Sequence, residues 1–104
     1  MIDTATFYIN EPIIGEVIKE ALKSGSVKRE DLFIKTKLHW NDTNHAFKAV
    51  EKSLKLLQVD YLDMYMPHVP LLPDIDLQSL QVKSLPLYKT WALLEEMVDR
   101  GLTK

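Results

Sequence analysis

Apolar residues recur at helical spacing in three segments of the chain. The first is residues 11–24, where Asn10 suits an N-cap, Pro12 suits the first turn and Gly25 suits the position after the helix. The other two are about residues 43–57 and 87–100, with Gly101 as the expected end of the last. The apolar stripes are Ile14, Val17, Ile18, Ala21 and Leu22, then Phe47, Val50, Leu54 and Leu57, then Leu87, Trp91, Leu94 and Val98. The pattern predicts three helices, the second capped at Asp42, Thr43 or Asn44.

Short apolar stretches lie between these helices at residues 2–5, 32–38 and 61–68, and we expect them to be strands. Alternation in the second places Phe33, Lys35 and Lys37 on one face. Strands that alternate with helices indicate an α/β fold with a parallel sheet. Residues 69–86 contain Pro70, Pro73 and Pro86, and their apolar residues recur at no clear spacing, which predicts a long loop.

The composition is that of one globular domain, residues 1–104, with 46% hydrophobic and 27% charged residues. A net charge of -2 indicates neither a nucleic-acid surface nor a polybasic membrane surface. No stretch approaches the roughly 18 apolar residues of a membrane helix. The chain has no cysteine, and its first residues lack the basic and apolar pattern of a signal peptide, so we expect a cytoplasmic location and no disulfide or thiolate metal site.

Four chemically active side chains fall at or near the carboxyl ends of the predicted strands. They are Asp3, Tyr8, Lys37 and His68. In parallel α/β folds these strand ends meet at one edge, where function resides. A cation beside a phenol favours the phenolate, a carboxylate can hold the lysine in place, and a neutral imidazole can donate to a substrate oxygen. Together they could donate a proton to a developing alkoxide.

Each of these residues has an ordinary structural interpretation when taken alone. Tyr8 could be a loop tyrosine, Lys37 a surface lysine, His68 a hydrogen-bonded structural histidine and Asp3 a turn cap. His39 and His45 do not have the spacing of a metal-ligand motif, so no metal site is predicted. The chain has no glycine-rich phosphate loop either.

The motifs around these residues resemble those of the aldo-keto reductase family. Residues 2–5, followed by Tyr8 and by Asn10-Glu11, resemble the signature around its catalytic tyrosine. Residues 29–38 are similar to its lysine strand, residues 53–70 to the passage into its histidine strand, and residues 90–102 to the helix before its fifth strand. The resemblance covers nearly the whole chain in unbroken order.

The resemblance implies part of a (β/α)8 TIM barrel, its second to fourth βα units, that reduces aldehydes and ketones with NADPH. It implies Tyr8 as general acid, Lys37 and Asp3 as its tuning pair, and His68 as the group that orients the carbonyl. It also implies that His39, Trp40 and Val69 contact the substrate and that Asp3 lies at the cofactor. His39, Pro67 and Val69 depart from the usual family residues, which changes the expected substrate range.

Length is the largest departure, because such a barrel has about 250 residues. The implied first strand and the segments from the fifth strand onward, which hold most cofactor contacts, have no counterpart in this sequence. One alternative is therefore an inactive truncated fragment that acts by association through exposed strand edges. A flavodoxin-like arrangement is a more distant alternative. Lys35 should have a carboxylate partner or lie open to water.

Overall fold

A three-stranded parallel sheet forms the centre of the molecule. The computed structural model describes residues 1–69, 75–76, 81–82 and 85–104. The strands are β1 (Ile2–Asp3), β2 (Ile34–Leu38) and β3 (Met64–Pro67), in the order β1-β2-β3. Both pairings are parallel, with Asp3 opposite Lys35 and Lys37 opposite Met66. The predicted α/β fold is confirmed, with shorter strands than expected.

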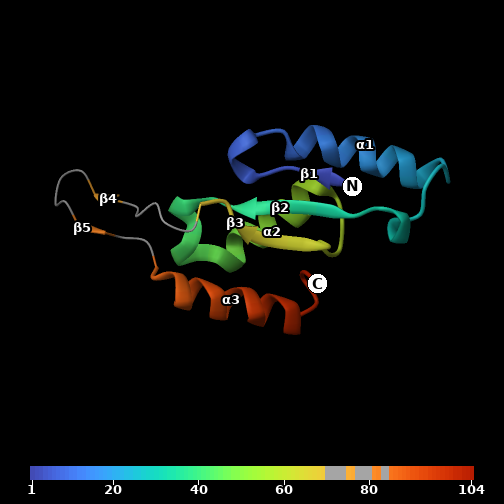
Figure 1. The fold of residues 1–104 in the computed structure, drawn as a ribbon. Coiled ribbons are helices and arrows are strands. Elements are labelled where there is room, and N and C mark those ends of the chain that lie inside the picture. Colours follow the sequence, from blue (N-terminus) through green and yellow to red (C-terminus); the bar gives the residue numbers. More distant parts are fainter. Residues whose placement is uncertain (70–74, 77–80, 83–84) are drawn as a thin grey trace.

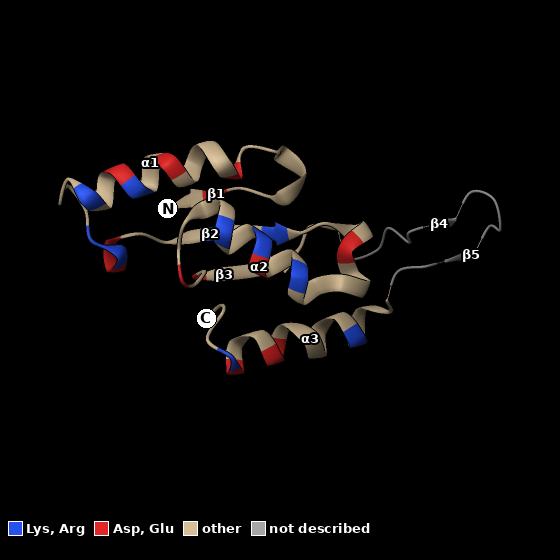
Figure 2. Ribbon diagram, turned by 180° about the vertical axis from the view of Figure 1, so that it is seen from behind, with Lys and Arg blue, Asp and Glu red and all other residues tan. Residues whose placement is uncertain are grey.

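All three long helices pack against one face of this sheet. They are α1 (Glu11–Lys23), α2 (Ala46–Leu57) and α3 (Leu87–Asp99), close to their predicted ranges. Figures 1 and 2 show α1 along one side, α3 along the other and α2 between them. Acidic and basic residues are interspersed along the helices in Figure 2. The core cluster takes residues from each helix and from β2 and β3: Ile18, Ile34, Leu38, Ala46, Ala49, Val50, Leu54, Leu57, Leu62, Tyr65, Leu94 and Met97.

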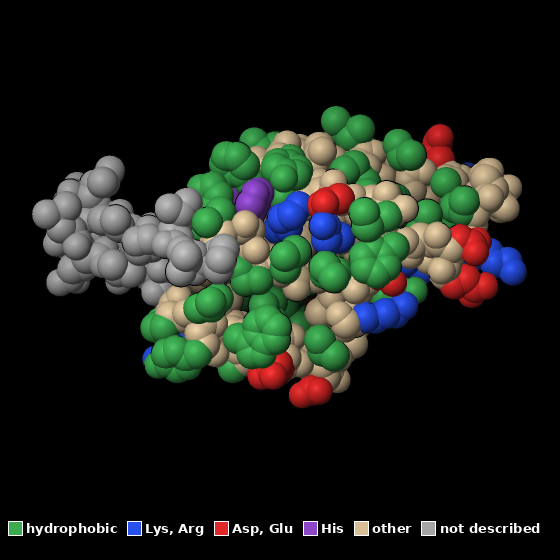
Figure 3. Space-filling model, in the orientation of Figure 1, with side chains coloured by type: hydrophobic (Ala, Val, Ile, Leu, Met, Phe, Trp, Pro, Cys, Tyr) green, Lys and Arg blue, Asp and Glu red, His purple; other side chains and the backbone are tan. Residues whose placement is uncertain are grey.

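The other face of the sheet, which we call the open face, is not covered by these helices. Alternation along β2 buries Ile34, Thr36 and Leu38 and leaves Lys35 and Lys37 half-buried on the open face. The register places two methionines of β3 beside the lysines, and Phe33 lies directly before the first residue of β2. The exposed fractions are 40% for Phe33, 40% for Met64 and 37% for Met66. Figure 3 shows charged side chains and a histidine among apolar ones on this side of the molecule.

Two predictions about the helices are wrong in detail. Residues Trp40–His45 form a 3-10 helix, η3, so α2 begins at Ala46 and is not capped at residues 42–44. The His39 side chain accepts the Asn41 N–H at the start of η3, which stabilises the tighter turn. In α3 the buried residues are Thr90, Leu94 and Met97, whereas Leu87, Trp91 and Val98 are exposed by 46%, 58% and 48%.

Two further 3-10 turns precede α1 and β2: η1 (Thr6–Tyr8) and η2 (Arg29–Asp31). Asn10 occupies the N-cap position of α1 as predicted, but its side chain accepts the Thr4 hydroxyl at 2.6 Å and does not cap the helix. Gly25 and Gly101 adopt φ angles of 72° and 73° past the ends of α1 and α3, in agreement with their predicted positions.

Short strands interrupt the segment that was predicted to be one loop, residues 69–86. Strands β4 (Ile75–Asp76) and β5 (Gln81–Val82) form an antiparallel pair. The rest of that loop prediction falls largely on residues outside those that the structure describes. In the described ranges, no helix combines the length and apolar character needed to cross a membrane.

Candidate active site

The carboxyl ends of β1 and β2 bring a carboxylate and two ammonium groups together on the open face. Lys37 Nζ donates to Asp3 Oδ1 at 2.6 Å and to the Thr4 carbonyl at 2.9 Å. Lys35 Nζ lies 2.7 Å from Asp3 Oδ2. Lys35 therefore has a carboxylate partner, which is one of the two arrangements expected from the sequence. Hydrogen bonds from Lys35 and then Lys37 lower the pKa of Asp3 below its usual value, which keeps this carboxylate ionised.

Tyr8 is placed next to this ion pair by η1. The Tyr8 N–H donates to the Ala5 carbonyl at 2.9 Å, which closes the turn directly after β1. Lys37 Nζ lies 5.2 Å from the centroid of the Tyr8 ring. The Tyr8 side chain is half exposed, so a small molecule can reach it from solvent.

His68 follows β3 and meets Tyr8 from the other side. Their ring centroids are 5.5 Å apart, and the rings are nearly perpendicular at 86°. The His68 N–H donates to the Leu38 carbonyl at 2.9 Å, which fixes the backbone after β3 against the end of β2. Burial, followed by the positive charge of Lys37 and the field of His39, lowers the pKa of His68. The imidazole is therefore neutral near pH 7, and its buried Nδ1 has no hydrogen-bond partner among the described residues.

Aromatic rings from η1 and from the start of η3 form a wall beside His68. Phe7 lies 5.1 Å from Trp40, 5.7 Å from His39 and 5.9 Å from His68, measured between ring centroids. His39 stacks on Trp40 at 4.0 Å. His39 and Trp40 were predicted at the substrate, and the structure brings both to the site. Val69 is half-buried after His68, with its contact to substrate still a prediction.

Phe7 was missed by the sequence reasoning, although it contacts three rings of this wall. Its position directly before Tyr8 in η1 is the signal that could have indicated it. Glu11 was also missed as a buried group. It is 2% exposed and accepts hydroxyl groups from Thr36 and Ser53, beneath the strand that carries Lys37.

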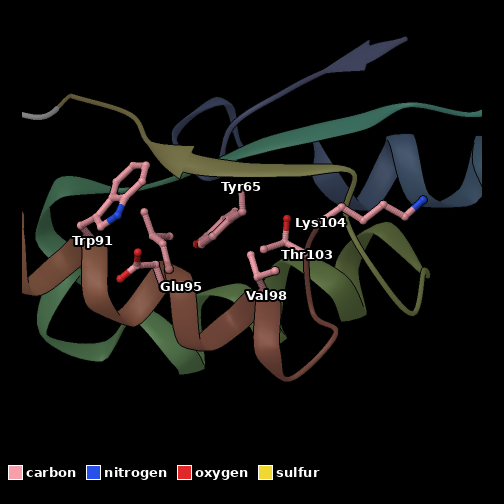
Figure 4. A pocket seen from close by; sticks show the side chains of 7 residues that line it. Tyr65, Trp91, Glu95, Val98, Thr103 and Lys104 are labelled. Carbon is pink, nitrogen blue, oxygen red and sulfur yellow. The ribbon is translucent and has the colours of Figure 1, made fainter.

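A separate cavity of about 160 Å³ lies between β3 and α3, away from these residues. Figure 4 shows that Tyr65 and Thr103 point into the space beside Trp91 and Val98. The hydroxyl groups of Tyr65 and Thr103 are buried and have no partner among the described residues. None of the predicted site residues lines this cavity, so it is not the candidate active site.

The chain is similar in sequence to known proteins. The sequence model described as "Aldo/keto reductase family" matches residues 1–104. The NADP-dependent D-sorbitol-6-phosphate dehydrogenase of Malus domestica is 37% identical, over 98% of this chain and 37% of that protein. Prostaglandin F synthase 1 of Bos taurus is 38% identical, over 99% of this chain and 35% of that protein. The chain thus spans about a third of the length of these relatives.

Solved structures give the same result for the fold. An aldo-keto reductase of Bombyx mori in complex with NADP superposes with a TM-score of 0.82 at 35% identity, covering 98% of this chain and 33% of that one. An aldose reductase of Giardia lamblia superposes with a TM-score of 0.83 at 32% identity, covering 98% of this chain and 38% of that one. The described fold is therefore part of a (β/α)8 barrel, as predicted.

Proposed function

Because the chain belongs to the aldo-keto reductase family, we propose that it carries the proton-donating part of an NADP(H)-dependent reduction of aldehydes and ketones to alcohols. The observation that carries this proposal is the grouping of Tyr8, Lys37 and His68 at one edge. The Lys37 ammonium lies 5.2 Å from the Tyr8 ring centroid, and the His68 ring lies 5.5 Å away on another side.

In the proposed reaction, a carbonyl oxygen lies between the Tyr8 hydroxyl and the His68 ring. Neutral His68 donates a hydrogen bond that orients the carbonyl. The Tyr8 O–H bond breaks, a new O–H bond forms on the substrate, and the phenolate that remains is stabilised by Lys37 until solvent returns a proton. Asp3 keeps the Lys37 side chain directed toward Tyr8. The rings of Phe7, His39 and Trp40 contact the carbonyl's substituents.

NADPH supplies the hydride for such a reduction when it is bound. The dehydrogenase from Malus domestica is NADP-dependent by its name, and the Bombyx mori structure holds NADP, which supports the same cofactor here. The described residues fit the reacting end of this cofactor, with Asp3 bonded to the lysine that lies near the proton donor. Both lysines of the open face are bound by Asp3, so the described residues offer no basic cluster there for its phosphates. We therefore expect weak cofactor binding by the 104-residue chain.

Tyr8→Phe is the direct test of the proton donor. Removal of the hydroxyl should abolish carbonyl-dependent oxidation of NADPH and leave cofactor affinity, followed by fluorescence titration, almost unchanged. Tyr88→Phe is the matched control, since Tyr88 is 71% exposed on α3. Equal loss of activity and cofactor affinity in Tyr8→Phe would contradict the role of Tyr8 as acid.

A second candidate is a non-catalytic chain that acts by association. Its support is that the chain spans 35% to 37% of the length of the two relatives named above. The same titration separates the candidates: saturable NADPH binding, even if weak, together with carbonyl-dependent oxidation supports the enzyme. No binding at millimolar NADPH would rule out reductase activity for this chain.

A further inference from the structure

A buried polar network lies directly beneath the candidate site and is not part of the proton-transfer group. Its centre is Glu11, in the first turn of α1, which is 2% exposed. Thr36 Oγ1 donates to Glu11 Oε1 at 2.7 Å, and Ser53 Oγ donates to Glu11 Oε2 at 3.2 Å. Thr36 and Ser53 are themselves 0% and 1% exposed. Buried carboxylates are rare unless they are paired or fully hydrogen-bonded, so this arrangement needs a reason.

The network joins the two segments that carry the candidate acid and its lysine. Thr36 directly precedes Lys37 on β2, and its side chain points to the helix side whereas Lys37 points to the open face. Thr6, at the start of η1, donates from Oγ1 to the Lys37 carbonyl at 3.1 Å and lies 3.4 Å from Ser53 Oγ. The turn that carries Tyr8 is thus held at Thr6 on one side and at Glu11 on the other.

A helix-stabilising role alone does not explain these contacts. An acidic residue in the first turn of a helix interacts favourably with the helix dipole and can do so while exposed to solvent. That role needs no hydroxyl from β2 or from α2. Glu11 instead accepts one hydroxyl from each, from residues 25 and 42 positions away in the sequence.

We infer that Glu11 is a positioning residue, which fixes the η1 turn and Tyr8 against β2 and Lys37 through Thr36, Ser53 and Thr6. The consequence for catalysis rests on the proposed function, whereas the consequence for geometry does not. Loss of the carboxylate leaves two buried hydroxyls without their acceptor and frees the end of η1 nearest α1. Tyr8 then moves relative to His68, although the β1–β2 pairing persists.

Nuclear magnetic resonance of the 104-residue chain tests the geometry directly. The reporter is the NOE between the Tyr8 and His68 rings, and the protection of the Thr4 N–H, bonded to Lys35 O at 2.9 Å, reports on the sheet. We expect Glu11→Leu to lose the ring NOE and keep Thr4 protection. Glu11→Gln, whose amide can still bond both hydroxyls, should keep both signals. Glu20→Leu, an exposed change on the same helix, is the matched control.

The titration of His68 gives a second spectroscopic signature. Phe7, Tyr8 and Trp40 face the half-buried His68 ring and cover part of it, while Lys37 and His39 supply the nearby charge. If η1 moves in Glu11→Leu, Phe7 and Tyr8 leave the imidazole more exposed and the pKa of His68 rises toward its usual value. A merely structural role, which lowers the unfolding temperature of an otherwise unchanged site, would not move this pKa in the folded chain.

An unchanged ring NOE in folded Glu11→Leu would overturn the inference, as would equal loss of the NOE in Glu11→Gln. If Glu11→Leu does not fold, Ser53→Ala and Thr6→Val each remove one link, and unchanged NOEs in both would also overturn it. In an active chain, kcat should fall at least ~10-fold in Glu11→Leu with little change in KM, because misplacement of about 1 Å is costly. Absence of carbonyl reduction combined with the expected NOE pattern would refute only the proposed function.

Discussion

Asp3 is the residue on which the charge balance of the open face depends. Its carboxylate forms ion pairs with both Lys35 and Lys37. Without it, these two ammonium groups would lie close together on the same face of β2 with no negative charge between them. Replacement of Asp3 by Asn removes the negative charge but keeps the size of the side chain. The two ammonium groups then repel one another, so Lys37 is no longer held beside Tyr8.

The effect of Asp3→Asn on the free energy of unfolding should depend on pH. The folded-state pKa of Asp3 is lowered, so its contribution to stability is present above the unfolded pKa of about 4 and is lost as pH falls through the folded pKa. The difference in unfolding free energy between the native chain and Asp3→Asn should be constant near neutral pH and should shrink below about pH 4. Urea denaturation at a series of pH values measures it. The exposed change Asp60→Asn is the control, and a difference independent of pH down to pH 2 would contradict this account.

Tyr65 carries a buried hydroxyl group that makes no stabilising hydrogen bond to the described residues. Burial raises the pKa of this phenol, and its oxygen has no partner among the described residues. Because an unpaired buried polar group costs free energy, Tyr65→Phe should leave stability unchanged or raise it by up to about 1 kcal/mol. Thermal and urea denaturation measure this, with Tyr88→Phe as the exposed control. A loss above about 1 kcal/mol would mean that the hydroxyl is hydrogen-bonded after all.

At the scale of elements, the sequence predicts α2 better than α3. The apolar residues of α2 define a single face that can be buried, and Val50, Leu54 and Leu57 are buried as expected. In α3 two stripes share Leu94, one through Trp91 and one through Thr90 and Met97, and the structure buries the second. Periodicity cannot choose between them, because the choice depends on packing against β3 and α2.

The same limit explains which site residues could be predicted. Asp3, Lys37 and His68 follow from the rule that the carboxyl ends of parallel strands meet at one edge. Glu11 does not follow from any local pattern, because its burial depends on hydroxyls that are distant in sequence. The wall formed by Phe7 likewise depends on how two 3-10 turns fold over the sheet edge, and turn geometry of this kind has little periodic signal.

The contact between α1 and α2 depends on Gly15. A Cβ atom at this position would lie 2.1 Å from the Leu56 carbonyl oxygen, and backbone cannot move aside as a flexible side chain can. Gly15→Ala should therefore force the helices apart and cost about 3 kcal/mol, at the upper end for overpacking. Gly25→Ala should cost only about 1 kcal/mol, because it meets no atom within 4 Å and is disfavoured by its positive φ alone. Urea denaturation compares the two, and similar losses would contradict the close helix contact.

At the scale of the whole molecule, the sheet has a covered face and an open face, with β1 and β3 as its outer strands. Phe33, Met64 and Met66 expose 37% to 40% of their surface on or beside the open face. Outer strands and exposed apolar sheet surface favour association with another chain. We therefore expect the isolated 12.0 kDa chain to self-associate as its concentration rises.

A lysine introduced on the open face tests whether the chain associates through the sheet or through non-specific contacts of apolar surface. Met64→Lys places a charge on the outer strand β3, beside the ammonium groups already present, and should weaken association at least ~10-fold, or about 1.4 kcal/mol. Ile13→Lys adds the same charge at a residue of α1 that is 70% exposed, and should change association little. Sedimentation equilibrium over a range of concentrations measures both. If both lysines weaken association equally, the effect comes from added surface charge in general and not from the sheet. A native chain that stays monomeric throughout would also contradict association through the sheet.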